Sequence, residues 1–301
     1  MISMYQKTIK NIIEFSGIGL HTGIEVKIRI LPSDKDSGIS FIRKDLPGSP
    51  VIKVNADNVV ATSYATTLGA NGVTVSTVEH LLAAFYGMGI DNAIVEVFGP
   101  EIPIMDGSAD AFVKMLDETG VARLDAPKKY IFIKKPIKVV EKDKFIYLEP
   151  SKDLRFTIDY TIDFSHPSLN RQSMVFSLSM DLFKKEVTRA RTFGFLKDIK
   201  TLKEHGLAKG GSLENAVVIG DDEILNKDGL RFSDEFVRHK ILDLIGDISL
   251  VGMPIIGRVS AFRSGHSLNQ ALVKKILEDK GSWRKFEFVD EESLQESFLR
   301  A

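Results

Sequence analysis

The segment from Glu235 to Leu250 constrains the fold most, because it carries two patterns that both repeat at the period of a helix. His239, Asp243 and Asp247 recur every four residues, so that an imidazole and a carboxylate can converge on one point. The opposite face is apolar, with the recurring residues Val237, Ile241, Leu244, Ile245 and Ile248. An imidazole and a carboxylate one turn apart are suitable ligands for Zn²⁺ if partners come from elsewhere in the fold. A solvated polar face on an ordinary amphipathic helix would show the same spacing.

The composition narrows the kinds of site that this chain can build. It contains no cysteine, which excludes disulfides, thiolate nucleophiles and cysteine-rich structural zinc sites. Zinc would be held by His, Asp, Glu and water, a set that is typical of a catalytic site with an open position. The 40 basic and 41 acidic residues give a net charge of −1, which does not indicate a nucleic-acid-binding protein.

The compartment and the assembly state are less constrained by the sequence. The first residues lack the apolar core of a signal peptide, and no apolar run approaches the length that spans a bilayer. We therefore expect a cytoplasmic protein without a transmembrane segment. The sequence does not set the oligomeric state, and a monomer is the working expectation.

The first half of the chain predicts strands and two helices. Alternating and β-branched stretches predict strands over residues 5–31, 38–43, 51–54 and 91–98. Ser76 and Glu79 match a capping box, which predicts a helix that ends at Gly87–Gly89, and a second helix is expected over 109–118. Residues 61–75 are small, polar and glycine-containing, so we expect a loop or a small excursion beside a site and not part of the core. The polar, proline-containing residues 125–129 are the best candidate linker.

The second half repeats this mixture of elements. Strands are expected over 130–133, 137–141, 145–149, 154–164, 216–219 and 254–262, and helices over 181–188, 199–205, 235–250 and 265–279. Both key helices contain His-x6-Gly, namely His80 with Gly87 and His239 with Gly246. These short matches are what two similar α+β domains facing one another across a shared site would show. At 301 residues the chain can bury two modest cores.

Three of the six histidines lie in settings that favour a site. His80, His239 and Asp243 make a three-ligand set for Zn²⁺ that leaves the fourth position for water. Glu79, next to a proposed ligand, is chemically suited to be the general base. His266 lies among small residues before a helix and could be the acid, with Asp247 holding it protonated and oriented.

Each of these residues also has a purely structural interpretation. Glu79 could only close the capping box on Ser76, and it could not perform both tasks well. His80 could be a polar residue of the first helical turn, and Asp247 a solvated one. His266 could simply begin its helix, although a positive histidine is not favoured at a helix N-terminus. His21, in a glycine turn, is better explained as a binding or structural residue than as a ligand.

A resemblance to a known family rests on ordered motifs from about residue 5 to about residue 275. The motifs are Gly19–Gly23 (GLHTG), Thr77–Leu81 (TVEHL), Glu101–Ser108 (EIPIMDGS), Ala190–Gly194 (ARTFG), Asp228–Phe232 (DGLRF), Val237–Asp247 and Ser264–Asn269 (SGHSLN). Together they closely resemble the UDP-3-O-acyl-N-acetylglucosamine deacetylases, which are zinc amidases of lipid A biosynthesis in Gram-negative bacteria. The resemblance implies hydrolysis of the N-acetyl group of UDP-3-O-(3-hydroxyacyl)-N-acetylglucosamine, which yields the free 2-amine and acetate in the committed step of that pathway.

The resemblance also implies an architecture. It predicts two related α+β domains over 1–126 and 127–301, each a helix layer packed on a β-sheet, with the active site between them. Each domain carries an insert, a small one at about 56–75 and a βαβ-like one at about 194–222 that forms an acyl-chain passage.

The site residues of the family carry over to matching positions. His80, His239 and Asp243 match the zinc ligands, Glu79 the general base and His266 the general acid or electrostatic partner. Asp247 matches the carboxylate that orients His266. The remaining matches concern the substrate: Thr192 and Lys240 near the oxyanion, Phe193 beside the sugar and nucleotide, Leu20 as a wall of the acyl site and His21 near its mouth.

Two departures from the family pattern affect substrate binding. Ala208 stands in a run, Gly206–Gly211, where the family often has cysteine, so the width of the acyl passage and its preferred chain length stay open. Arg263 stands where lysine is common, which offers the diphosphate a bidentate fork instead of a point charge.

Two other functions remain as alternatives. One is a zinc amidohydrolase of the same architecture that acts on another N-acyl substrate. The other is a two-domain binding protein without zinc, in which the histidines are structural. The choice between zinc and iron in the cell is not set by a His/His/Asp set of ligands.

Overall fold

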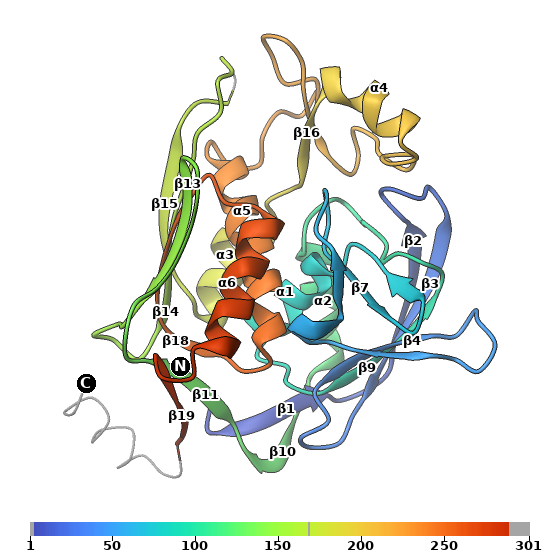
Figure 1. Cartoon of the computed structure of the whole chain (residues 1–301). Helices are drawn as coiled ribbons and strands as arrows, with labels where there is room; N and C mark the ends of the chain where they lie inside the picture. Colours follow the sequence, from blue (N-terminus) through green and yellow to red (C-terminus); the bar gives the residue numbers. More distant parts are fainter. Residues whose placement is uncertain (1–2, 168, 289–301) are drawn as a thin grey trace.

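The fold is α+β, as the sequence predicts, with sheets on the outside and helices between them (Figure 1). The computed structural model describes residues 3–167 and 169–288, and all structural statements concern this part of the chain. In Figure 1 the helices α1, α5 and α6 occupy the centre of the molecule. The sheet of the first half lies on one side of them and the sheet of the second half on the other.

The first half is built on a five-stranded sheet. Its strand order is β2 (Ile13–Ile18), β3 (Glu25–Pro32), β9 (Ala93–Phe98), β4 (Ile39–Arg43) and β5 (Val51–Lys53). In β3 the side chains of Val26, Ile28 and Ile30 are fully buried while those between them face solvent, which is the period-two pattern seen in the sequence. Two helices pack on the buried face, α1 (Glu79–Met88) and α2 (Asp110–Thr119).

The second half is built on a seven-stranded sheet that β18 (Ile255–Phe262) organises. The path runs β12 (Ile137–Glu141), β13 (Lys144–Glu149), β18, β11 (Lys129–Ile133) and β19 (Trp283–Glu287). β14 (Phe156–Ile162) pairs with β18 in parallel and carries β15 (Gln172–Ser177) on its other edge. The helices α5 (Glu235–Ile248) and α6 (His266–Glu278) cover the inner face, and α3 (Met180–Glu186) reaches α1.

Two strand pairs and two short 3-10 turns lie outside these two sheets. Strands β16 (Phe193–Phe195) and β17 (Val217–Ile219) are parallel and are joined through α4 (Leu196–Glu204). Strands β1 (Tyr5–Ile9) and β10 (Val121–Pro127) form an antiparallel pair. Short 3-10 turns lie at Ala56–Asn58 and Ser249–Val251. No helix in the described part of the chain has the length and apolar character that a membrane crossing requires.

Residues 61–75 are not the loop that the sequence predicts. They belong to a three-stranded antiparallel sheet of β6 (Val59–Ala61), β7 (Thr67–Ala70) and β8 (Val73–Val75). Leu68 and Val75 are fully buried and belong to the main core. The strands are too short to show an alternating pattern against so many small and polar residues, and therefore the prediction of a loop outside the core was wrong. The segment does lie beside the candidate site, since Thr66 contacts Glu79 and Asp247.

The segment expected as a linker is also ordered. β10 extends to Pro127 and β11 begins at Lys129, so that only Lys128 separates two strands. The side chain of Lys128 is buried and its Nζ lies 2.8 Å from Oδ1 of Asp91. The sequence patterns also did not predict β10, β15, β16 or β19 as strands.

Candidate active site

The helix α5 is buried on both of its faces. His239, Asp243 and Asp247 are at most 3% exposed, although their spacing alone is equally typical of a solvated face. They face α1, which comes from the first half of the chain and packs along α5. The alternative of a solvated polar face is therefore wrong for this helix.

Gly246 allows the two helices to approach closely. A Cβ atom built on Gly246 would lie only 2.1 Å from the backbone oxygen of Glu79, so no larger residue fits there without moving a helix. The contact places the first turn of α1, with Glu79 and His80, directly against α5. Gly87 has a similar role at the other end of α1, where its Cβ would overlap the ring of Phe183.

His80, His239 and Asp243 converge on one point. Oδ1 of Asp243 lies 3.2 Å from Nε2 of His239 and 3.6 Å from Nε2 of His80. One ligand atom from each residue lies within 4.8 Å of the other two. Oδ1 of Asp243 is buried and has no hydrogen-bond partner in the described part of the chain. A buried carboxylate oxygen without a donor, between two imidazoles, fits a divalent cation.

The surroundings set the protonation states that a metal requires. Burial lowers the pKa of His239 to about 3, so its imidazole is neutral and able to act as a ligand. Its Nδ1 lies 3.1 Å from the backbone oxygen of Ala190, which assigns the proton to Nδ1 and leaves Nε2 free. Burial alone would raise the pKa of Asp243, but neighbouring groups, among them the cation of Lys240, hold it well below its usual value. Nζ of Lys240 lies 2.8 Å from Oδ2 of Asp243.

Glu79 does not close a capping box. The residue that precedes α1 is Val78, no side chain caps the helix, and the hydroxyl of Ser76 lies 3.0 Å from that of Thr67 instead. Oε2 of Glu79 accepts a hydrogen bond of 3.0 Å from the backbone N–H of Thr66. Burial raises the pKa of Glu79. Its carboxylate is therefore available to the site.

His266 begins α6 and is paired with Asp247. Its Nδ1 lies 2.8 Å from Oδ2 of Asp247, and its Nε2 lies 3.8 Å from Oε1 of Glu79. Burial opposes protonation of His266, but the charge and hydrogen bond of Asp247 outweigh it and raise the pKa to about 10. Asp247 also accepts hydrogen bonds from the hydroxyl of Thr66 at 2.6 Å and the amide of Asn269 at 2.9 Å. His266 is consequently a cation at neutral pH.

The glycine turn that carries Leu20 and His21 is held by Glu101, which is fully buried. Its carboxylate accepts hydrogen bonds from the backbone N–H of His21 and from the N–H and hydroxyl of Thr22, at 2.7–2.9 Å. It also accepts one of 2.9 Å from the hydroxyl of Thr77, a residue held at φ 56° two positions before Glu79. The turn is thus tied to the start of α1.

The same turn touches the βαβ unit of the second half. The backbone oxygen of Leu20 accepts a hydrogen bond of 3.0 Å from Gly210, and that of His21 accepts one of 3.2 Å from Lys209. A Cβ on Gly210 would lie 2.2 Å from the oxygen of Gly19, so glycine is required at this crossing. Leu20 and His21 therefore lie where the two halves of the chain meet.

The residues of the second half that the resemblance assigns to the substrate make contacts of their own. The centroid of the Phe193 ring lies 4.9 Å from that of Phe236 and 6.2 Å from that of His239. Nζ of Lys240 lies 5.4 Å from the centroid of the Phe193 ring. The N–H of Thr192 donates to the oxygen of Gly107 at 2.8 Å. Arg263, at the end of β18, forms an ion pair with Asp143.

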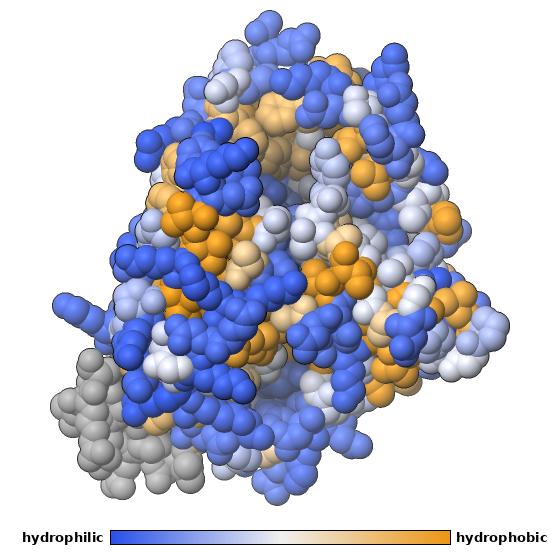
Figure 2. Space-filling model, viewed as in Figure 1, coloured by the Kyte–Doolittle hydropathy of each residue, from blue (hydrophilic) through white to orange (hydrophobic). Residues whose placement is uncertain are grey.

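The surface near these residues is hollowed. Figure 2 shows a recess between the β15 side of the molecule and the unit formed by β16 and α4, with weakly hydrophobic residues on its floor. The first turns of α5 and strand β16, which begins at Phe193, border this recess (Figure 1).

Sequence reasoning missed two residues that complete the site. Thr66 is 1% exposed and donates its N–H to Glu79 and its hydroxyl to Asp247. Asn269 is fully buried and donates to Asp247. Asn269 lies one turn after His266, which could have signalled its role, whereas Thr66 lies in a polar stretch without any distinguishing pattern.

Comparison of the sequence with known proteins identifies the family of this chain. The sequence model of the family described as "LpxC: UDP-3-O-acyl N-acetylglycosamine deacetylase" matches residues 6–278. The UDP-3-O-acyl-N-acetylglucosamine deacetylase of Syntrophus aciditrophicus is 48% identical over 286 residues, which cover 95% of this chain and 90% of that protein. The protein of the same name from Myxococcus xanthus is 50% identical over 277 residues, which cover 92% of this chain and 88% of that protein. The one from Helicobacter hepaticus is 46% identical over 299 residues, which cover 98% of this chain and 99% of that protein. The chain therefore belongs to the UDP-3-O-acyl-N-acetylglucosamine deacetylase family.

Proposed function

We propose that this protein removes the N-acetyl group of UDP-3-O-(3-hydroxyacyl)-N-acetylglucosamine in the committed step of lipid A biosynthesis, with Zn²⁺ held by His80, His239 and Asp243. The observation that carries the metal assignment is the buried Oδ1 of Asp243, which lies without a hydrogen-bond donor between two imidazoles. The family membership supports the reaction. A nucleotide-linked sugar as substrate also supports the cytoplasm as the place of action.

The donor set suits zinc. Two imidazoles and one carboxylate are a common set of protein ligands for catalytic zinc, and they leave a coordination position open. Bound Zn²⁺ acts as a Lewis acid that polarises a carbonyl oxygen and makes water more acidic. The rest of the chemistry falls to the side chains around the triad.

Glu79 is proposed as the general base. Its buried carboxylate, with a raised pKa and Oε2 fixed by the N–H of Thr66, is placed to take a proton from the water that attacks the acetamide carbonyl. The carbon–oxygen bond that forms leads to loss of the carbon–nitrogen bond. The products are acetate and the free amine, which gains a proton as it leaves.

His266 is proposed to act on the negative charge or the leaving group of the reaction, as the counterpart of the base Glu79. Held as a cation by Asp247, it stabilises the negative charge that develops on the carbonyl oxygen or gives its proton to the departing amine. Lys240 and the hydroxyl of Thr192 are proposed to lie near the same oxygen. Nζ of Lys240 already contacts Asp243, so its charge lies beside the proposed zinc ligands.

The other parts of the substrate are assigned to the surrounding surfaces. We place the sugar and nucleotide beside Phe193, and the diphosphate near Lys240 and Arg263. Leu20 forms a wall for the acyl chain and His21 lies at its mouth, where the glycine turn meets Lys209 and Gly210. Ala208, small and apolar, leaves room for a chain in this passage.

The test is metal analysis together with acetate release from the UDP-linked acyl sugar. His239→Ala is expected to lose both stoichiometric zinc and activity, and an active, metal-free variant would contradict the proposal. Release of acetate that does not depend on the 3-O-acyl chain would favour the alternative, a zinc amidohydrolase for another N-acyl substrate. Purified protein without zinc, and insensitive to chelators, would indicate a binding protein.

A further inference from the structure

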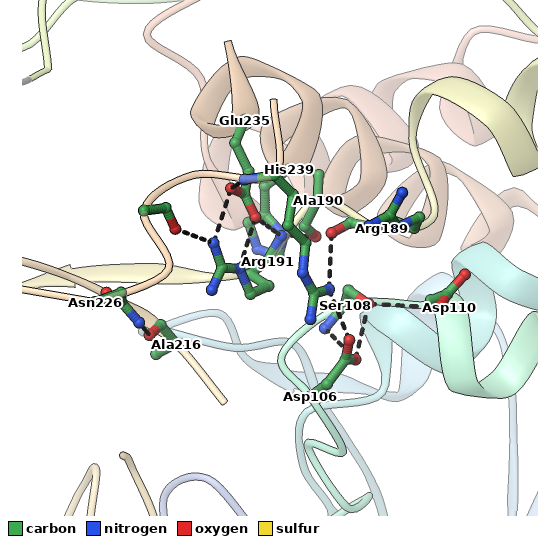
Figure 3. Close-up of polar contacts among 12 residues, drawn as sticks. Asp106, Ser108, Asp110, Arg189, Ala190, Arg191, Ala216, Asn226, Glu235 and His239 are labelled. Carbon is green, nitrogen blue, oxygen red and sulfur yellow. Dashed lines mark hydrogen bonds and ion pairs between the residues drawn. The ribbon is translucent and has the colours of Figure 1, made fainter. Parts of the chain in front are cut away.

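Arg191 and Glu235 form a buried ion pair beside the proposed zinc ligands, but they are not among those ligands (Figure 3). Their side chains are 7% and 0% exposed. Nε of Arg191 lies 2.8 Å from Oε1 of Glu235, and Nη2 lies 3.1 Å from Oε2, so the guanidinium contacts the carboxylate with two nitrogens. Neither residue belongs to the set that the sequence motifs assign to catalysis or zinc.

The carboxylate of Glu235 also holds the backbone. Its Oε1 accepts a hydrogen bond of 3.0 Å from the N–H of Arg191, and its Oε2 one of 2.6 Å from the N–H of Arg231. Nη2 of Arg191 donates to the oxygen of Gly229 at 2.8 Å. Glu235 is the first residue of α5, so the pair fixes two loop segments to the start of this helix.

The segment that is fixed in this way contacts a proposed zinc ligand. Ala190, directly before Arg191, presents its backbone oxygen to Nδ1 of His239 at 3.1 Å, and Figure 3 shows the two groups beside the ion pair. His239 lies one helical turn after Glu235. The partner of Nδ1 decides which nitrogen of a ligating histidine faces the metal and how the ring is oriented.

A second ion pair holds the same segment from the first half of the chain. Arg231 contacts Oδ2 of Asp106 at 2.7 Å and donates to the oxygen of Arg189 at 3.0 Å. The N–H of Thr192 donates to Gly107 at 2.8 Å. The backbone from Arg189 to Thr192 is therefore fixed at its beginning, its middle and its end.

Stability is a weak explanation for such a pair. Removing two charges from water costs about as much as their attraction returns, and apolar replacements of buried pairs are often neutral or stabilising. Fixing the geometry is the better explanation, since the two nitrogens of the planar guanidinium contact the two oxygens of Glu235 and so favour one orientation of the carboxylate. We propose that Arg191 and Glu235 are positioning residues that hold the oxygen of Ala190 against His239 and thereby set the orientation of this metal ligand.

The inference rests on the proposed metal site, and its test measures metal binding directly. The variants are Arg191→Met, Glu235→Gln, Arg191→Lys and the double variant Arg191→Met/Glu235→Met. The double variant leaves neither charge buried without its partner. Zinc affinity is measured by competition with a chelating dye. The ligand geometry is read from the visible absorption spectrum of the protein loaded with Co²⁺.

We expect zinc affinity to fall by about 10–100-fold in all four variants, with an altered Co²⁺ spectrum. Arg191→Lys keeps the charge but loses the fork, and is expected to recover only part of the affinity. Arg238→Met is the matched control. Arg238 lies on the same helix and pairs with Glu186 and Asp234, yet it does not hold the segment before Thr192. It is expected to lower the melting temperature without a change in zinc affinity.

Two outcomes overturn the inference, and they are distinguishable. If the wild-type protein binds zinc and the folded double variant binds it equally well with the same Co²⁺ spectrum, the pair is structural only. If the wild-type protein binds no metal in this assay, the proposed zinc site fails and the inference fails with it. Weaker zinc binding by the folded double variant, with normal binding by Arg238→Met, supports it.

Discussion

Two carboxylates one turn apart on α5 have nearly the same surroundings but differ in the number of hydrogen bonds that their oxygens accept. Asp243 and Asp247 are both buried, and each lies beside imidazoles. Asp247 accepts from three side chains, those of Thr66, His266 and Asn269. Asp243 has a contact with Lys240 at one oxygen, and its other oxygen has no donor in the described part of the chain.

The histidines that the two carboxylates face also differ in protonation state. His239 is neutral, with a pKa of about 3, because burial is not offset by its open carboxylate partner. His266 is a cation, with a pKa of about 10, because Asp247 outweighs burial. The unused oxygen of Asp243 is open to a metal, whereas Asp247 contacts His266 directly and keeps a proton on it.

The largest effect is expected from removing the open carboxylate. Asp243→Ala takes away a ligand and should abolish stoichiometric zinc and lower kcat by roughly a thousandfold or more, since a Lewis acid is worth several kcal/mol. Metal content and acetate release are measured on the same sample. Activity near the wild-type level without bound metal would show that Asp243 and Asp247 do not differ in the way proposed.

Glu79→Gln is expected to have the next largest effect, without loss of metal. Glutamine still accepts the hydrogen bond from Thr66 but cannot take a proton, so kcat should fall by about 100–10,000-fold. Zinc content should stay stoichiometric, in contrast to Asp243→Ala. Loss of zinc in this variant would place Glu79 among the ligands and not beside them.

Asp247→Asn removes the charge that keeps His266 protonated. In the wild-type protein the cation persists until the pH rises through about 10, so the activity that depends on it should fall only above that pH. In the variant the pKa of His266 drops, because burial then acts without the opposing charge. The alkaline decline of kcat/KM should therefore move to lower pH, while zinc content is retained. An unshifted pH–rate profile would contradict the role of Asp247.

Much of this comparison was predictable from the sequence. The spacing of His239, Asp243 and Asp247, with the apolar face opposite, indicated a helix, and α5 covers Glu235–Ile248. Ordered motifs supplied His80, Glu79 and His266, and the family match agrees with that resemblance. The sequence could not show that the polar face of α5 is buried, because the helix that covers it, α1, comes from the other half of the chain.

The rest depended on contacts that leave no local pattern. Glu79 and Ser76 match a capping box in sequence, yet tertiary contacts with Thr66 and Thr67 compete for both side chains. Thr66 lies directly before β7, a strand too short for an alternating pattern, so neither its burial nor its two hydrogen bonds could be read from its neighbours. The pairing of Arg191 with Glu235 likewise joins residues far apart in the chain.

The smallest effect is expected from Thr66→Val, which leaves Oδ1 of Asp247 without this hydroxyl donor and so makes Asp247 more like Asp243. Valine has nearly the shape of threonine and keeps the backbone N–H that Glu79 accepts, but it removes the 2.6 Å hydrogen bond to Oδ1 of Asp247. A hydrogen bond to a buried charge is worth about 1.5–3 kcal/mol, so the free energy of unfolding should fall by that amount in urea denaturation. Thr66→Ser keeps the hydroxyl and is the control. Zinc content should be unchanged, because Asp247 still holds His266 and Asn269; loss of zinc would mean that the two carboxylates share one site.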